Sequence, residues 1–103
     1  MIGGLMVTLV VGELACFSQG DEEAFFDWLN GIGCVADVRN VGRQLLISVE
    51  ENDLPDADLR ELIALFHRYG VDKKQLAQFV TPGNAPWFRD DETMFWHHEV
   101  FAA

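Results

Sequence analysis

The alternation of apolar and polar residues predicts strands in three parts of the chain. Residues 5–11 form an apolar, β-branched run typical of a buried strand, and residues 14–17 either continue it or form a short second strand. Residues 34–39 and 44–49 alternate on either side of the turn sequence Asn40-Val41-Gly42, so they predict an antiparallel hairpin. The first hairpin strand is expected to carry its small apolar side chains on one side, namely Cys34, Ala36 and Val38.

A first helix is predicted by its start and stop signals. Ser18 and Asp21 have the S-x-x-D spacing of a helix start, and the acidic residues 21–23 fall in the first turn, where the helix dipole favours anions. Asn30-Gly31 signals the end, because glycine tolerates the left-handed conformation that ends many helices. The apolar residues expected to share one face of this helix are Ala24, Phe25, Trp28 and Leu29.

A second helix has the clearest helical period in the chain. The residues at the i, i+3, i+4, i+7 spacing of one helix face are Leu59, Leu62, Ile63 and Phe66, and the stripe is widened by Leu65 and Tyr69. Asp53 or Asp56 can cap the start of this helix, where Pro55 is tolerated. Gly70 followed by Val71 predicts a glycine C-cap with its hydrophobic contact.

The rest of the chain predicts shorter helices. Residues 72–75 have a capping-box-like spacing and open a short helix, which residues 81–84 end. Asp90-Asp91-Glu92 are expected to open a last helix that runs through Val100. The tail is dense in aromatic residues that need burial on this domain or on a second copy: Trp87, Phe88, Phe95, Trp96 and Phe101.

Together these elements predict one α+β domain over residues 1–103. Their order is β(β)αββα followed by short C-terminal helices, which we expect to form an antiparallel sheet with helices packed on one face. Half of the 103 residues are apolar, which is enough for a core without a metal or a disulfide. Cys16 and Cys34 are therefore interpreted as small buried hydrophobic residues, with a disulfide or a reactive thiol as the alternatives.

The charge balance restricts the class of partner. Seventeen acidic and seven basic residues give a formal net charge of −10 at pH 7. A field of this sign repels phosphate backbones and anionic lipids and attracts basic protein surfaces, so we expect neither nucleic-acid nor membrane binding. No basic residue precedes the apolar residues 1–11, and no run approaches the roughly 20 apolar residues of a membrane span, which favours a cytoplasmic protein.

Residues with ligand chemistry are few. His97-His98-Glu99 has suitable side chains for a metal, but adjacent helical residues point about 100° apart, and the i, i+4 spacing of HExxH zinc sites is absent. His67 lies near the end of the second helix, where the dipole alone favours a cation. The glycines form no phosphate-binding motif, so nucleotide binding has no support. From these observations together, the sequence predicts no metal, no cofactor and no catalytic residue.

The acidic residues fall into three clusters, and each precedes a predicted helix. Most of them are therefore explained as solvated helix starts. The functional alternative is an acidic face that docks a basic protein, such as a nuclease or a nucleic-acid-binding factor. The candidate protein-binding residues are tail aromatics, which could equally belong to the core, and the acidic residues beside them: Trp87, Phe88, Trp96, Asp90, Asp91 and Glu92.

Two parts of the chain carry a resemblance to a class of proteins. The first part consists of residues 58–66 with Arg68-Tyr69, Val71-Asp72 and Gln75-Leu76, and the second of Trp87-Phe88 with Phe95-Trp96-His97 and Val100-Phe101. They cover roughly the last two thirds of the chain and resemble small uncharacterised bacterial proteins of about a hundred residues, of the mobile-gene-cassette or immunity-like type. The resemblance implies a product of a mobile gene cassette or a toxin-neutralising partner, and it brings no site residue.

Two functions are compatible with these observations. The leading hypothesis is a non-enzymatic module that binds another protein, in its sharpest form an immunity-like or inhibitor protein with a basic partner. The alternative is a small enzyme or ligand-binding protein, with a pocket between the sheet and the C-terminal helices and His67, His97 and His98 as acid–base groups. A homodimer that buries the apolar tail and residues 5–11 is compatible with both.

Overall fold

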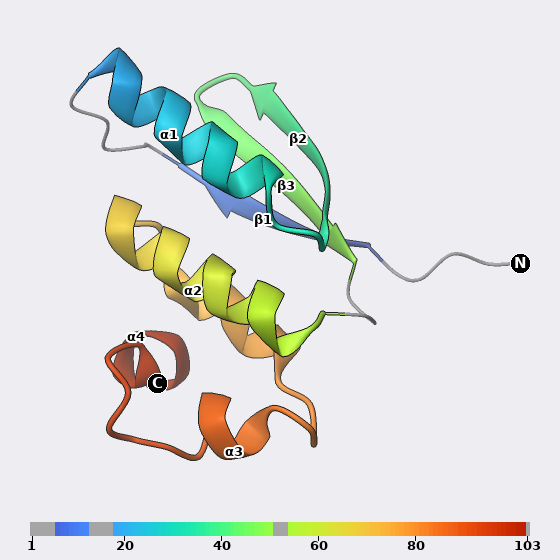
Figure 1. Cartoon of the computed structure of the whole chain (residues 1–103), viewed down its shortest axis with the longest axis vertical. Coiled ribbons are helices and arrows are strands. Elements are labelled where there is room, and N and C mark those ends of the chain that lie inside the picture. The colour runs from blue at the N-terminus through green and yellow to red at the C-terminus, as the bar shows by residue number, and fades with distance from the viewer. Residues whose placement is uncertain (1–5, 13–17, 51–53, 103) are drawn as a thin grey trace, which may run out of the picture.

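The computed structural model describes residues 6–12, 18–50 and 54–102 of the chain. Its strands are β1 (Met6–Val11), β2 (Val35–Val41) and β3 (Gln44–Glu50). They form one antiparallel sheet in the order β1-β3-β2, so β3 is central and the other two strands are edges (Figure 1). The predicted hairpin is confirmed as β2 and β3, whereas residues 14–17, predicted to be extended, lie outside the described residues.

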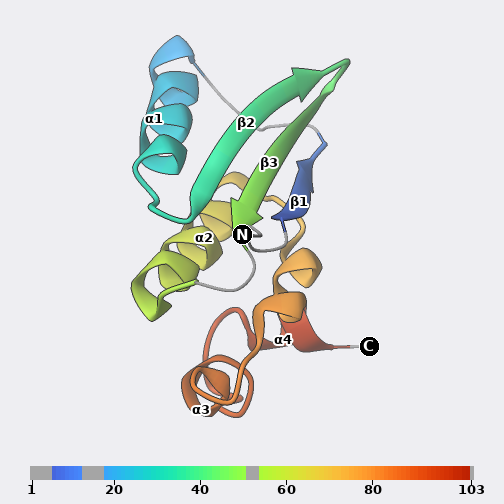
Figure 2. The same cartoon turned by 90° about the vertical axis from the view of Figure 1, so that its right-hand side faces the viewer.

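The helices lie on one side of this sheet, which confirms the predicted α+β architecture. They are α1 (Gln19–Asn30), α2 (Asp56–Tyr69), the 3-10 helix η1 (Lys73–Phe79), α3 (Ala85–Phe88) and α4 (His97–Phe101). α1 and α2 run beside each other, and α3 and α4 lie beyond α2 on the side away from the sheet (Figure 1, Figure 2). Within the described residues, no helix is both long and apolar enough to span a membrane.

One face of the sheet is buried against the helices. The alternation predicted for β3 is confirmed, because Leu45, Ile47 and Val49 are all buried. Ile47 stands at the centre of the sheet, between Leu9 of β1 and Val38 of β2. The opposite face of the sheet is open and carries exposed apolar side chains at Met6, Val10 and Val41.

Strand β2 contains a bulge that changes its predicted pattern. Between Val35 and Asp37 the pairing advances two residues on β2 but only one on β3, so Ala36 is the extra residue. The bulge leaves Ala36 exposed to solvent. The prediction that Ala36 shares one buried side with Cys34 and Val38 is therefore wrong, because a bulge interrupts the period of two.

Helix α1 begins as its sequence predicts. The Ser18 hydroxyl accepts a hydrogen bond from the backbone N–H of Asp21 (3.1 Å), which satisfies one of the unpaired donors of the first turn. The predicted apolar face is narrower than expected, since Ala24 is exposed. The buried residues of α1 are Phe25 and Leu29, one turn apart, with Trp28 half-buried beside them.

Helix α2 supplies the centre of the core. All six apolar positions predicted for its stripe are buried. Its N-cap is Pro55, and among the described residues no side-chain hydrogen bond caps this end. The expectation that Asp56 caps the helix is wrong, because Asp56 is already the first helical residue, where its charge favours the dipole instead. The alternative cap, Asp53, lies outside the described residues.

Glycine ends two elements through a left-handed conformation. Gly70 has φ 70° after α2, and the N–H of Val71 donates to the carbonyl of Phe66 (2.9 Å), as the predicted C-cap requires. Gly42 has φ 62° in the turn between β2 and β3. Gly31 does end α1, but its φ of −82° is right-handed, so the predicted left-handed cap there is wrong. Its N–H instead continues the helical pattern to the Asp27 carbonyl.

The C-terminal part differs most from expectation. Asp72 caps the predicted short helix by accepting from the Lys74 N–H (3.0 Å), although this helix is 3-10 rather than α. The last helix was expected to open at Asp90-Asp91-Glu92, but α4 begins only at His97. The carboxylate of Asp91 accepts hydrogen bonds from both the N–H and the hydroxyl of Thr93, and these stabilise a turn in place of a helix start.

Candidate protein-docking surface

The outward face of α2 is flanked by two tryptophans. On one side, Trp28 of α1 donates its indole N–H to the Glu61 carboxylate (2.7 Å). On the other, Trp87 of α3 donates to the Asp56 carboxylate (3.1 Å), and the Arg60 guanidinium lies 3.9 Å from the centre of its ring. Both tryptophans are half-buried, so each presents part of a fixed ring to solvent.

The three aromatic residues predicted to bind a partner lie in two environments. Phe88 and Trp96 are buried in the core, and the Trp96 indole N–H donates to the Phe88 carbonyl (3.1 Å). A partner cannot touch these two side chains in this conformation. Trp87 reaches the surface and packs edge-on against Trp96, with ring centres 6.1 Å apart. The buried pair therefore supports Trp87 from beneath.

The most exposed aromatic side chain of the described residues is Phe95, which the sequence patterns do not predict as a site residue. It is 54% exposed. Its ring packs on His67 of α2 and on Trp96, with ring centres 4.6 and 5.1 Å away. Its place two positions after the polar residues 89–93 is the one sequence feature that could have singled it out.

The predicted acidic residues come together in the turn between α3 and α4. Asp90 pairs with Arg89 (2.9 Å), and Glu92 is exposed. The pKa of Asp91 is lowered, mainly because the Thr93 hydroxyl and N–H donate to the carboxylate. All three therefore form a charged turn that stands between Trp87 and Phe95 in the chain. We call Trp87, Phe95 and residues 90–92 the α3–α4 surface.

The three histidines make different contacts. His67 packs under Phe95, and His97 Nε2 lies 2.8 Å from the Arg89 carbonyl oxygen. His98 lines a surface groove of about 440 Å³ between the start of η1 and α4, which neither of the other two histidines lines. In the part of the chain that the structure describes, no group of three or more His, Cys, Asp or Glu side chains is arranged to hold a metal ion.

The same groove contains a buried lysine. Lys73 is 5% exposed in its side chain, and its ammonium group pairs with the carboxylate of Glu99 on α4. The hydrogen bond from Lys73 lowers the pKa of Glu99, with smaller contributions from the charges of Lys73, His67 and His98. This ion pair ties η1 to α4.

Cys34 is a buried thiol at the start of β2. Burial, and then the charge of Asp58, raise its pKa to about 12. Nearly all of the side chain is therefore protonated at neutral pH, which disfavours the reactive-thiol alternative for Cys34. Cys34 is a free cysteine in this structure, which also disfavours the disulfide alternative. Cys16 lies outside the described residues.

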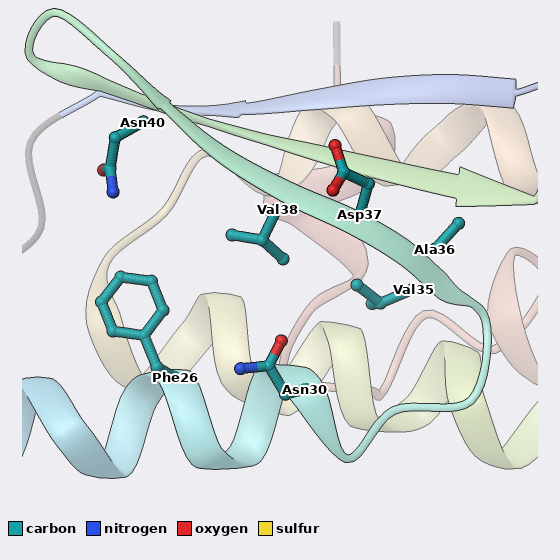
Figure 3. Close-up of a pocket in the computed structure, with 7 residues that line it drawn as sticks. All are labelled: Phe26, Asn30, Val35, Ala36, Asp37, Val38 and Asn40. Atoms are coloured by element: carbon teal, nitrogen blue, oxygen red, sulfur yellow. The ribbon is translucent and has the colours of Figure 1, made fainter.

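A second groove of about 390 Å³ lies between α1 and β2 (Figure 3). Phe26 and Asn30 extend from α1 towards the strand, and Val35, Val38 and Asn40 extend from β2 towards the helix. The groove opens along the edge of the sheet that β2 forms. Its lining mixes apolar rings and methyl groups with amides.

Comparison of the chain with protein-family models, with curated proteins and with solved structures finds no match. Arguments about function therefore rest on the surfaces described above. The α3–α4 surface combines a rigid aromatic foundation, one exposed ring and carboxylates. That chemistry suits contact with a protein that presents lysine or arginine.

Proposed function

We propose that the chain is a non-enzymatic, cytoplasmic module that binds a basic protein through its α3–α4 surface. The observation that carries this proposal is Phe95, a phenyl ring 54% exposed that follows the acidic residues 90–92 in the chain and packs on the same Trp96 ring as Trp87. Large aromatic side chains dominate the energetics of protein interfaces. The net charge of −10 would steer a basic partner towards the molecule.

The surroundings of Phe95 support a preorganised surface. Trp87 is fixed by Asp56 and Arg60 of α2, and the buried Phe88 and Trp96 lie beneath. Little side-chain entropy is lost on binding when the contact residues are already held in place. The sharpest form of this function is an immunity-like or inhibitor protein that masks a basic site on its partner.

The alternative function, a small enzyme or ligand-binding protein, has weaker support. Acid–base chemistry by the histidines requires them to face one cavity. His67 and His97 instead contact Phe95 and the Arg89 carbonyl, and only His98 of the three lines the groove beside α4. Phe95 and the charged turn have no place in that function, whereas protein binding uses both.

Affinity capture from a bacterial lysate tests the proposal. Wild-type protein on a resin at low ionic strength should retain a basic protein in stoichiometric amount and release it at a salt step. Phe95→Ala should reduce retention roughly 30-fold, the loss typical of an interface hot spot. Asp90→Asn with Glu92→Gln should lower retention mainly at low salt, because rim charges act through steering. Asp91 is left unchanged because it holds the turn.

A matched control separates this surface from charge alone. Glu22→Gln with Glu23→Gln removes two exposed charges from α1, far from Phe95 in the sequence. We expect this variant to retain the partner nearly as well as the wild type. Equal losses for both charge variants, with none for Phe95→Ala, would show non-specific ion exchange and reject the proposal, as would an empty eluate from the wild-type resin.

A further inference from the structure

Alternate residues of β2 point their backbone N–H and C=O groups away from β3, towards the free edge of the sheet. The Glu50 N–H donates to the Cys34 carbonyl (3.2 Å), which makes Val35 and Val49 a non-hydrogen-bonded pair. Such pairs alternate along an antiparallel ladder. Counting along β3, Val38 opposite Ile47 and Asn40 opposite Leu45 are therefore also non-hydrogen-bonded. The N–H and C=O groups of Val38 and Asn40 consequently point away from β3, towards the free edge.

These edge groups are open to a further strand. Among the described residues, no hydrogen bond reaches the backbone of Val38 or Asn40 from outside the sheet. The N–H of Val35 is already used, because it donates to the Ile32 carbonyl (3.1 Å). Figure 3 looks onto this edge and shows no described element in front of β2. The open backbone groups of this edge therefore lie at Val38 and Asn40, on either side of Arg39.

The side chains around Val38 are self-complementary. Asp37 and Arg39 lie on the open face of the sheet and form an ion pair within the strand (3.2 Å), with the side chains 55% and 72% exposed. If a second β2 pairs antiparallel about Val38, Asp37 of each copy stands opposite Arg39 of the other. A register one residue later would place Arg39 opposite itself, at a position whose backbone faces β3. In that second register Val38 of each copy would face Asn40 of the other, so the hydrogen-bond phase allows both registers. The charges favour the register centred on Val38.

We propose that two copies of this chain associate through β2, antiparallel and centred on Val38. The interface continues the sheet across a two-fold axis and gives six strands. Val38 forms the central hydrogen-bonded pair, and its side chain meets the same valine of the second copy on the buried face. The groove beside Phe26 lies next to this axis, so the second copy covers its open side. This interface does not use the α3–α4 surface.

Net charge gives the dimer a characteristic salt dependence. Each copy carries −10, so long-range repulsion opposes association at low ionic strength. Added salt should therefore strengthen the dimer, whereas it should weaken binding of a basic partner to the α3–α4 surface. The direction of the salt dependence therefore distinguishes the dimer from partner binding. If either association is not observed, the proposal of the other is unaffected.

Charge reversal on β2 tests the register. Asp37→Arg alone and Arg39→Asp alone each place like charges opposite one another in a self-pair, and we expect each to weaken the dimer about tenfold or more in sedimentation equilibrium. A mixture of the two single variants should associate, because every arginine then faces an aspartate. The double variant, Asp37→Arg with Arg39→Asp, should recover self-association. Glu92→Arg and Arg68→Asp make the same charge changes elsewhere and should leave the dimer intact.

Hydrogen exchange supplies an independent measurement on the folded protein. Dimerisation should slow exchange of the Val38 amide as protein concentration rises, while the β2 amides that already bond to β3 change little. A wild-type chain that stays monomeric at its highest soluble concentration and at high salt overturns the proposal. So does a dimer that both single charge variants leave unchanged, because that dimer uses another surface.

Discussion

The two edge strands of this sheet are protected in opposite ways. Both pair with β3, but the edge of β1 is occupied by a side chain 65 residues away: the Gln75 amide donates to the Val10 carbonyl (2.9 Å) and accepts from the Val10 N–H (2.7 Å). Gln75 thus stands in for a neighbouring strand. The edge of β2 has no such cover among the described residues. It carries a bulge and the exposed charges of Asp37 and Arg39 instead.

The β1 edge is closed by hydrogen bonds from another element, whereas in the part of the chain that the structure describes the β2 edge stays open and is restricted by its charges and its bulge. An unpaired edge is a template for unwanted association, and charges or bulges restrict which strands it accepts. Closing the β1 edge requires η1 to be held in place, and Leu76, Phe79 and the Lys73–Glu99 pair hold it. The β2 edge needs no distant element, and its charges favour one register.

The largest effect is expected from removing the anchor of η1. Leu76 is fully buried next to Gln75, so Leu76→Ala should destabilise the fold by about 2–5 kcal/mol through lost burial and the cavity left behind. Urea unfolding measures this free energy. The control is Lys74→Ala, an exposed residue of the same helix, which should change the stability by less than about 0.5 kcal/mol. Equal values for both variants would show that η1 does not depend on this contact.

A smaller effect is expected from uncovering the β1 edge alone. Gln75→Ala removes both hydrogen bonds to Val10 but keeps the helix anchored, so the loss should be about 1–2 kcal/mol. Exchange of the Val10 amide should accelerate while exchange in β3 is unaffected. Gln78→Ala, which removes one exposed hydrogen bond within η1, is the matched control. Unchanged exchange at Val10 would show that Gln75 does not close this edge.

The sequence predicts the elements whose signals are local. The stripe of α2, its end at Gly70 and the alternation of β3 all depend on residues a few positions apart, and each is confirmed. The bulge at Ala36 and the late start of α4 are different. The first is a property of a strand pair, and in the second the side-chain bonds of Asp91 to Thr93 compete with the helix.

The candidate surface was predicted in part, for the same reason. The acidic residues 90–92 are placed on the surface by polarity alone. Whether Phe88, Trp96 or Phe95 faces solvent depends on how α3, α4 and the turn between them pack against α2. The period of apolar residues along the chain does not specify this packing. The role of Gln75 is equally long-range, because its partner strand lies at the other end of the chain. Non-local contacts of this kind leave no local pattern.

The smallest effect concerns the ion pair that ties η1 to α4. Glu99→Gln removes the charge that faces the buried ammonium of Lys73, so it should destabilise the protein modestly at pH 7. Because the folded pKa of Glu99 is lowered below its ordinary value of 4.5, the contribution of the carboxylate is complete above that value and is lost as pH falls through the folded pKa. The stability difference between wild type and variant should therefore shrink in acid. In a Lys73→Met background, which leaves no ammonium to pair, Glu99→Gln should have little effect at any pH, and a penalty that persisted there would mean that Glu99 acts through another contact.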